Sequence, residues 1–145
     1  MRFRHGFTLV EVVVAIGILA TTLCVLLGVY SACTILVSTS KSINIATNAV
    51  LGLMEEIRTS SFADIEDYNG LQFVLNAVPE SRGVVYVDDT NPELLEVTVS
   101  VCWRQGNRII GEDANLNGAL DGGEDQNGNG KIDSPVQIVT RIANR

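Results

Sequence analysis

The feature that most constrains this 145-residue sequence is a single long apolar run near its start. Between Phe7 and Val37 the only charged residue is Glu11. A helix over these residues would be about 45 Å long at about 1.5 Å per residue, whereas the hydrocarbon core of a bilayer is about 30 Å thick. The run is therefore long enough to cross a membrane, and it is about twice as long as the apolar core of an ordinary secretory signal.

The charges at the start of the chain predict its orientation and raise a question about Glu11. Arg2, Arg4 and His5 precede the apolar run, and positive charge favours the cytoplasmic side of a membrane. The N-terminus is therefore expected in the cytoplasm and the rest of the chain on the other side. A carboxylate within hydrocarbon is costly unless it is paired or lies near the interface, so something is expected to compensate the charge of Glu11.

The segment from Gly6 to Glu11, Gly-Phe-Thr-Leu-Val-Glu, followed by an uninterrupted apolar helix, resembles the class III signal of type IV prepilins and type II secretion pseudopilins. The resemblance implies that a prepilin peptidase removes residues 1–6 and methylates the new N-terminus at Phe7. Glu11 would then be the fifth residue of the mature chain. In the assembled fibre, the Phe7 amino group could pair with Glu11 of a neighbouring subunit.

Two other interpretations of this segment remain open. In the first, residues 7–37 are a plain signal anchor in which Glu11 is a tolerated interfacial charge. In the second, Tyr30-Ser31-Ala32-Cys33 acts as a lipobox, although it lacks the usual aliphatic residue three positions before the cysteine.

Beyond the apolar run, residues 38–60 predict an amphipathic continuation of the helix, because apolar residues recur at steps of three and four at Ile43, Ala46, Val50, Leu53 and Ile57. One helix from about Thr8 to Thr59 is expected. Residues 61–145 are expected to form the head, and strict alternation over residues 95–104 predicts its main strand. Shorter strands are expected at 84–87, 108–110 and 136–142, with a connecting segment without strands over 68–83.

These elements predict an α+β, pilin-like fold in which a three- or four-stranded antiparallel sheet packs on the second half of the helix. The alternation of the main strand places Trp103 in the core or at the sheet edge. It places Cys102 on the opposite face, which is expected to be open to solvent.

Two stretches of twelve residues, 113–124 and 125–136, follow each other and superimpose, and residues 112–134 are predicted to form an insertion. The first resembles the EF-hand calcium loop, with oxygen ligands at positions 1, 3, 5, 7, 9 and 12 and a glycine at position 6. Alternate ligands converge on one point, the glycine permits a sharp turn, and the final glutamate can bind bidentately. The predicted calcium ligands are Asp113, Asn115, Asn117, Ala119, Asp121 and Glu124.

The second stretch matches the pattern less completely. Its predicted ligands are Asp125, Asn127, Asn129, Lys131 and Asp133, but Val136 stands at the twelfth position, so a bidentate acid must come from elsewhere or be absent. No helices are expected to flank the loops, so an EF-hand domain with a target groove is not predicted. The competing interpretation is a cluster of Asn/Gly turns that binds no metal.

Composition excludes several classes of function. The net charge of −7 excludes a basic surface for nucleic acid, and the single histidine, His5, leaves no His-based catalytic site. Three cysteines are too few for a disulfide scaffold. The chain is therefore expected not to be an enzyme.

The function that the resemblance implies is that of a minor type IV pilin or a type II secretion pseudopilin with a calcium-stabilised head. Such a protein would be held in the bacterial inner membrane by one span. Its partners would be other pilin or pseudopilin subunits and prepilin peptidase. Two alternatives are a single-pass calcium-binding protein that does not polymerise and a binding module released by signal peptidase.

Overall fold

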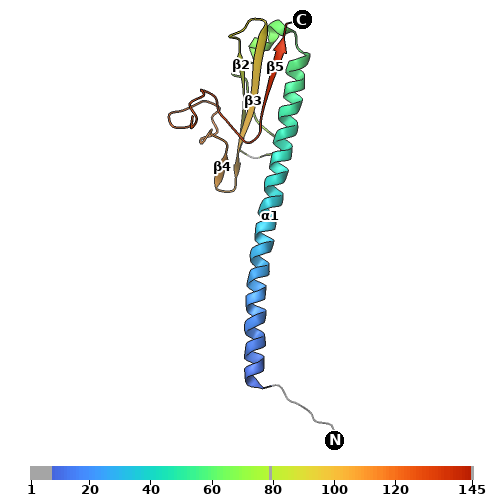
Figure 1. Cartoon of the computed structure of the whole chain (residues 1–145), viewed down its shortest axis with the longest axis vertical. Coiled ribbons are helices and arrows are strands. Elements are labelled where there is room, and N and C mark those ends of the chain that lie inside the picture. Colours follow the sequence, from blue (N-terminus) through green and yellow to red (C-terminus); the bar gives the residue numbers. More distant parts are fainter. Residues whose placement is uncertain (1–7, 79, 145) are drawn as a thin grey trace. The chain divides into compact units, whose positions relative to one another are not determined.

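The computed structural model describes residues 8–78 and 80–144, and the chain divides into two compact units, residues 1–39 and 40–145. One long helix is followed by a short 3-10 helix and an antiparallel sheet, which confirms the predicted α+β class (Figure 1). The elements are α1 (Leu9–Thr59), η1 (Phe62–Tyr68), β1 (Gln72–Phe73), β2 (Ser81–Asp88), β3 (Leu94–Gln105), β4 (Arg108–Ile110) and β5 (Gln137–Ala143).

The described part of the first unit consists of the N-terminal portion of α1, whose apolar side chains are exposed. Leu9 is 81% exposed and Leu36 is 66% exposed. The hydroxyls of Thr21 and Thr22 donate to the Ile18 carbonyl at 2.9 and 3.0 Å, so these polar groups are satisfied within the helix. Among the described residues, α1 is the helix that is long and apolar enough to cross a membrane.

In the second unit, the remainder of α1 buries one face against the sheet. Ala46, Val50 and Ile57 of the predicted stripe are fully buried, together with Met54 at 3% exposure. They share one core with the inward-facing residues of β3, which are all fully buried: Leu95, Val97, Val99, Val101 and Trp103. Of the other two stripe residues, Leu53 is half-buried against this core and Ile43 is exposed. The predicted amphipathic continuation is therefore confirmed from Ala46 onward, and so is the core position of Trp103.

The sheet has five strands, so the prediction of three or four was wrong. The order is β1-β2-β3-β4, all antiparallel, and β5 pairs with residues 94–100 of β3. The additional strand, β1, lies in the segment that was predicted to be irregular. It pairs with Gly83 and Val84 of β2, and Phe73 lies so close to Gly83 that a Cβ there would be 2.2 Å from its ring. Sequence alternation does not reveal a two-residue strand that depends on such a tertiary contact.

The face of the sheet opposite the helix is covered by the segment between β4 and β5. Thr98, Ser100 and Cys102 point to this face, and all three are at most 1% exposed. Cys102 forms a second, smaller core with Val84 and Ile132. The expectation that Cys102 faces solvent was therefore wrong, because a loop without regular secondary structure covers this face.

Candidate functional site

At the start of α1, Thr8 and Glu11 form a reciprocal cap. The Glu11 N–H donates to Thr8 Oγ1 at 3.3 Å, and the Thr8 N–H donates to Glu11 Oε2 at 3.4 Å. This is a capping box, which satisfies donors that have no partner within the helix. The sequence analysis missed it, although Thr-x-x-Glu before an apolar run is its signal. Gly6 and Phe7, the predicted cleavage and methylation residues, lie outside the described residues.

The first loop of the segment 112–134, here called the tandem, is organised around its first and last acids. The carboxylate of Asp113, which is fully buried, accepts the N–H groups of Asn117 at 3.1 Å and Gly118 at 2.8 Å. Glu124, 8% exposed, accepts the N–H groups of Ala114 and Asp121, each at 2.9 Å. The acids at positions 1 and 12 thus bind backbone N–H groups within their own loop.

The remaining predicted ligands of the first loop converge on Asp121. The amide nitrogens of Asn115 and Asn117 each lie 2.8 Å from Asp121 Oδ2. Their carbonyl oxygens accept the N–H groups two residues ahead, at Asn117 and Ala119, at 2.9 and 2.7 Å. The structure therefore brings together the side chains that the sequence predicted for the first loop.

The second loop repeats this arrangement twelve residues later. Asp125 accepts the N–H groups of Asn129 at 3.1 Å and Gly130 at 3.0 Å. The amide nitrogens of Asn127 and Asn129 both donate to Asp133 Oδ2. The four oxygen-bearing side chains predicted for the second loop are therefore also brought together. Lys131 stands at position 7, where the ligand would be its backbone carbonyl, and its ammonium lies 3.7 Å from Glu96 Oε1 outside the loop.

One further residue that the sequence analysis did not assign contacts the second loop. Glu112 Oε1 accepts the N–H of Gln126 at 3.4 Å, and its Oε2 accepts the N–H of Asp133 at 3.1 Å. The sequence signal for it was the Glu-Asp pair that occurs at residues 112–113 and again at 124–125.

The tandem concentrates negative charge that the described residues do not neutralise. It holds six carboxylates and one lysine, a net charge of −5 out of the −7 of the chain. Neither Asp113 nor Glu124 forms an ion pair with any residue that the structure describes, although both are buried. Burying an ionised carboxylate is costly unless a cation compensates it. Residues that supply only oxygen ligands fit a hard cation such as calcium.

The described residues contain no group of three or more His, Cys, Asp or Glu side chains arranged to hold a metal ion. Asparagines account for two of the five predicted side-chain ligands in the first loop and for two of the four in the second. A cation would therefore depend on mixed carboxylate and amide oxygens.

The tandem is fixed to the sheet by polar contacts as well as by the small core. Arg82 Nε donates to the Leu116 carbonyl at 3.2 Å, and Gln72 Nε2 donates to the Gly118 carbonyl at 2.9 Å. The Tyr86 hydroxyl accepts the Ile132 N–H at 3.1 Å. Burial raises the pKa of Tyr86 and that of Cys102 above their ordinary values.

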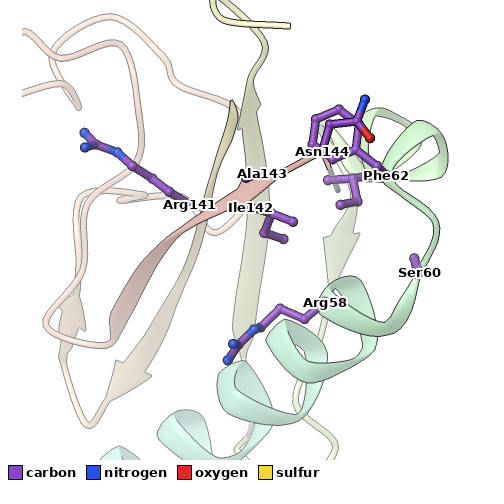
Figure 2. A pocket seen from close by; sticks show the side chains of 8 residues that line it. Arg58, Ser60, Phe62, Arg141, Ile142, Ala143 and Asn144 are labelled. Carbon is purple, nitrogen blue, oxygen red and sulfur yellow. The ribbon is translucent and has the colours of Figure 1, made fainter. Parts of the chain in front are cut away.

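A cavity of about 460 Å³ lies elsewhere in the second unit, between the end of α1, η1 and β5. Figure 2 shows that its two arginines, Arg58 and Arg141, do not point toward each other. Arg58 is paired with Glu55 at 3.3 Å and Arg141 with Glu96 at 3.0 Å. Among the described residues that line the cavity, no charged groups therefore converge on a ligand position.

Comparison with known proteins identifies the start of the chain. The family model described as the prokaryotic N-terminal methylation motif matches residues 1–23. Neither the curated proteins nor the solved structures gave a significant match. The matched residues include the predicted cleavage site, the capping box and the beginning of the apolar helix. The chain therefore carries the N-terminal prepilin motif of type IV pilin-like proteins.

Proposed function

We propose that this protein is a structural subunit, a minor type IV pilin or a type II secretion pseudopilin, that assembles through the N-terminal half of α1 and catalyses no reaction. The observation that carries the proposal is the conjunction of the methylation motif at residues 1–23 with a helix whose large apolar residues are exposed. Such a surface needs an apolar partner. Lipid would cover it before assembly and the helices of neighbouring subunits would cover it afterwards.

The charges near the N-terminus support the same proposal. Arg2 and Arg4 favour a cytoplasmic N-terminus, with the head on the other side of the inner membrane. Removal of residues 1–6 would free the amino group of Phe7, whose ordinary pKa is about 8, so it would be largely cationic at neutral pH. This cation on one subunit would compensate the carboxylate of Glu11 on the next.

We further propose that the head binds calcium in the first loop, through Asp113, Asn115, Asn117, Asp121 and Glu124 with the carbonyl of Ala119. The burial of Asp113 and Glu124 without a basic partner among the described residues supports this. Calcium would supply positive charge there and no chemistry beyond it. Its binding would replace the amide–carboxylate hydrogen bonds at Asp121 with contacts between oxygen and the ion. With calcium bound, the loop would keep the tandem packed on the face of the sheet opposite the helix.

Intact-mass analysis of the protein purified from membranes tests the proposed class. In a host with prepilin peptidase, the mature chain should begin at Phe7 and carry one additional methyl group. In a matched host without the peptidase, it should retain residues 1–6 without methylation. A chain that is unprocessed in both hosts would favour the plain anchor. A chain that begins near Ala32 or Cys33 would contradict the pilin proposal and favour a secreted module or a lipoprotein.

A further inference from the structure

We propose that Glu112 is the twelfth ligand of the second loop, so that the tandem holds two calcium ions. This rests on the proposed calcium binding by the first loop. Sequence position does not assign Glu112 to either loop, because it precedes both of them. The assignment comes from the place that its carboxylate occupies in the fold.

Glu112 makes the same contacts to the second loop that Glu124 makes to the first. Glu124 accepts the N–H groups at loop positions 2 and 9, which belong to Ala114 and Asp121. Glu112 accepts the N–H groups at positions 2 and 9 of the second loop, which belong to Gln126 and Asp133. Both carboxylates are therefore bound by equivalent backbone donors, and Glu112 takes the role that Val136 cannot fill.

This arrangement relates the two loops as an interlocked pair. Glu124 precedes Asp125, the first residue of loop two, yet completes loop one. Glu112 precedes Asp113, the first residue of loop one, and completes loop two. The Glu112 N–H also donates to the Asp133 carbonyl at 2.9 Å, so the two ends of the tandem already meet. An ion in the second loop would fasten these ends together.

Charge favours a second ion as well. A single divalent cation would leave the tandem with a net charge of −3, whereas two would leave it at −1. In the described residues Lys131 is the one basic side chain of the tandem, and it is paired with Glu96. Mutual repulsion among the carboxylates of the second loop would therefore remain without the second ion.

The test measures calcium stoichiometry on the full mature chain in detergent micelles, by isothermal titration after removal of calcium. The wild type should bind two ions. Glu112→Gln and Glu124→Gln should each keep one calcium ion at wild-type affinity. The second ion should be lost or bound at least tenfold more weakly. Glu93→Gln removes an exposed carboxylate outside the tandem and should still bind two. Near-ultraviolet circular dichroism without calcium should show that each variant keeps the wild-type fold, because glutamine has the size of glutamate and keeps one of its two acceptor oxygens for the backbone N–H groups.

Double variants assign the lost site. Glu112→Gln with Asp133→Asn should bind one ion, like either change alone, because both residues would serve the second loop. Glu112→Gln with Glu124→Gln should bind none. Two ions in Glu112→Gln with unchanged affinity would overturn the role of Glu112 and leave the first site intact. One ion in the wild type, lost in Glu124→Gln, would overturn the second site alone. No ion in the wild type would overturn calcium binding altogether.

Discussion

At the scale of single residues, Glu11 meets two demands that different variants can separate. Its carboxylate accepts hydrogen bonds from Thr8, which cap the start of α1. These donors are neutral and leave the negative charge uncompensated. The cap belongs to the single chain, whereas the proposed compensation of the charge by Phe7 of a neighbour would belong to the fibre.

We expect Glu11→Val to remain in the membrane but to enter fibres poorly, because it loses both the cap and the charge. Glu11→Gln keeps an acceptor for Thr8 and loses only the charge. If assembly depends on the charge, both variants should be depleted to a similar extent from sheared fibres, when the amount of subunit in fibres is divided by the amount in the membrane. Fibre yields near wild type for the Gln variant would instead assign the role of Glu11 to capping.

Gly111 is a second residue whose identity the structure explains. Its φ is +108°, and a Cβ on it would lie 2.2 Å from Cys102 Sγ. Gly111→Ala should therefore destabilise the head by about 1–3 kcal/mol or more, from backbone strain and the clash. Chemical denaturation should detect this loss. Gly122→Ala is the matched control, because a Cβ there meets nothing within 4 Å, and its free energy of unfolding should stay close to that of the wild type.

At the scale of elements, the tandem acts as a third layer of the head. β3 presents Leu95, Val97 and Val99 to the helix, and Thr98, Ser100 and Cys102 to the tandem. The layer holds few apolar residues, so much of its attachment depends on hydrogen bonds and, in our proposal, on calcium. Its detachment should be measurable at Cys102.

Removal of calcium should expose the Cys102 thiol to alkylation. In a Cys24→Ala/Cys33→Ala background, Cys102 is the remaining thiol of the chain. With calcium, labelling by iodoacetamide at pH 7.5 should be slow, because the thiol is fully buried and its pKa is raised by burial. With EGTA, labelling should become at least tenfold faster, as mass spectrometry would record. Equal rates in both conditions would mean that calcium does not hold this layer.

At the scale of the whole molecule, calcium that binds only the folded head should raise its stability. At about 100-fold excess over Kd, one site contributes about 2.7 kcal/mol. Calorimetric melts of the chain in micelles should therefore shift upward by several degrees with calcium. Magnesium should shift them less, because its octahedral shell is smaller than a site with a bidentate glutamate prefers. Superimposable melts with calcium, magnesium and EGTA would mean that the tandem is a polar turn cluster.

Alkaline pH should also destabilise the head, through Cys102 and Tyr86. Burial raises the pKa of both groups in the folded state, so the unfolded chain loses these protons first as pH rises. The stability they contribute is intact below their unfolded pKa values, near 8.5–9 for the thiol and 10 for the phenol, and is lost as pH rises through the folded values. Melting temperatures between pH 7 and 11 should fall above about pH 9. The fall should begin later in Cys102→Ala, whose melting temperature at pH 7 should be lower.

Much of the chain could be predicted from the sequence, because the relevant forces are local. The apolar run and the periodicity of three and four determine one helix from Leu9 to Thr59, and strict alternation determines β3. The twelve-residue repeat determines which side chains of each loop meet, since hydrogen bonds within a loop span at most ten residues. The methylation motif is likewise a property of contiguous residues.

Only the tertiary structure decided what these local units contact. Strand β1 depends on the ring of Phe73 lying over Gly83, and the burial of Cys102 depends on a loop that the alternation of β3 does not reveal. Glu112 contacts residues of the second loop that are 14 and 21 positions away in the sequence, which is farther than the twelve-residue repeat extends. The hydrophobic periodicity of a helix or strand indicates which face a residue lies on. Which segment packs against that face is decided by contacts between parts of the chain that are distant in the sequence.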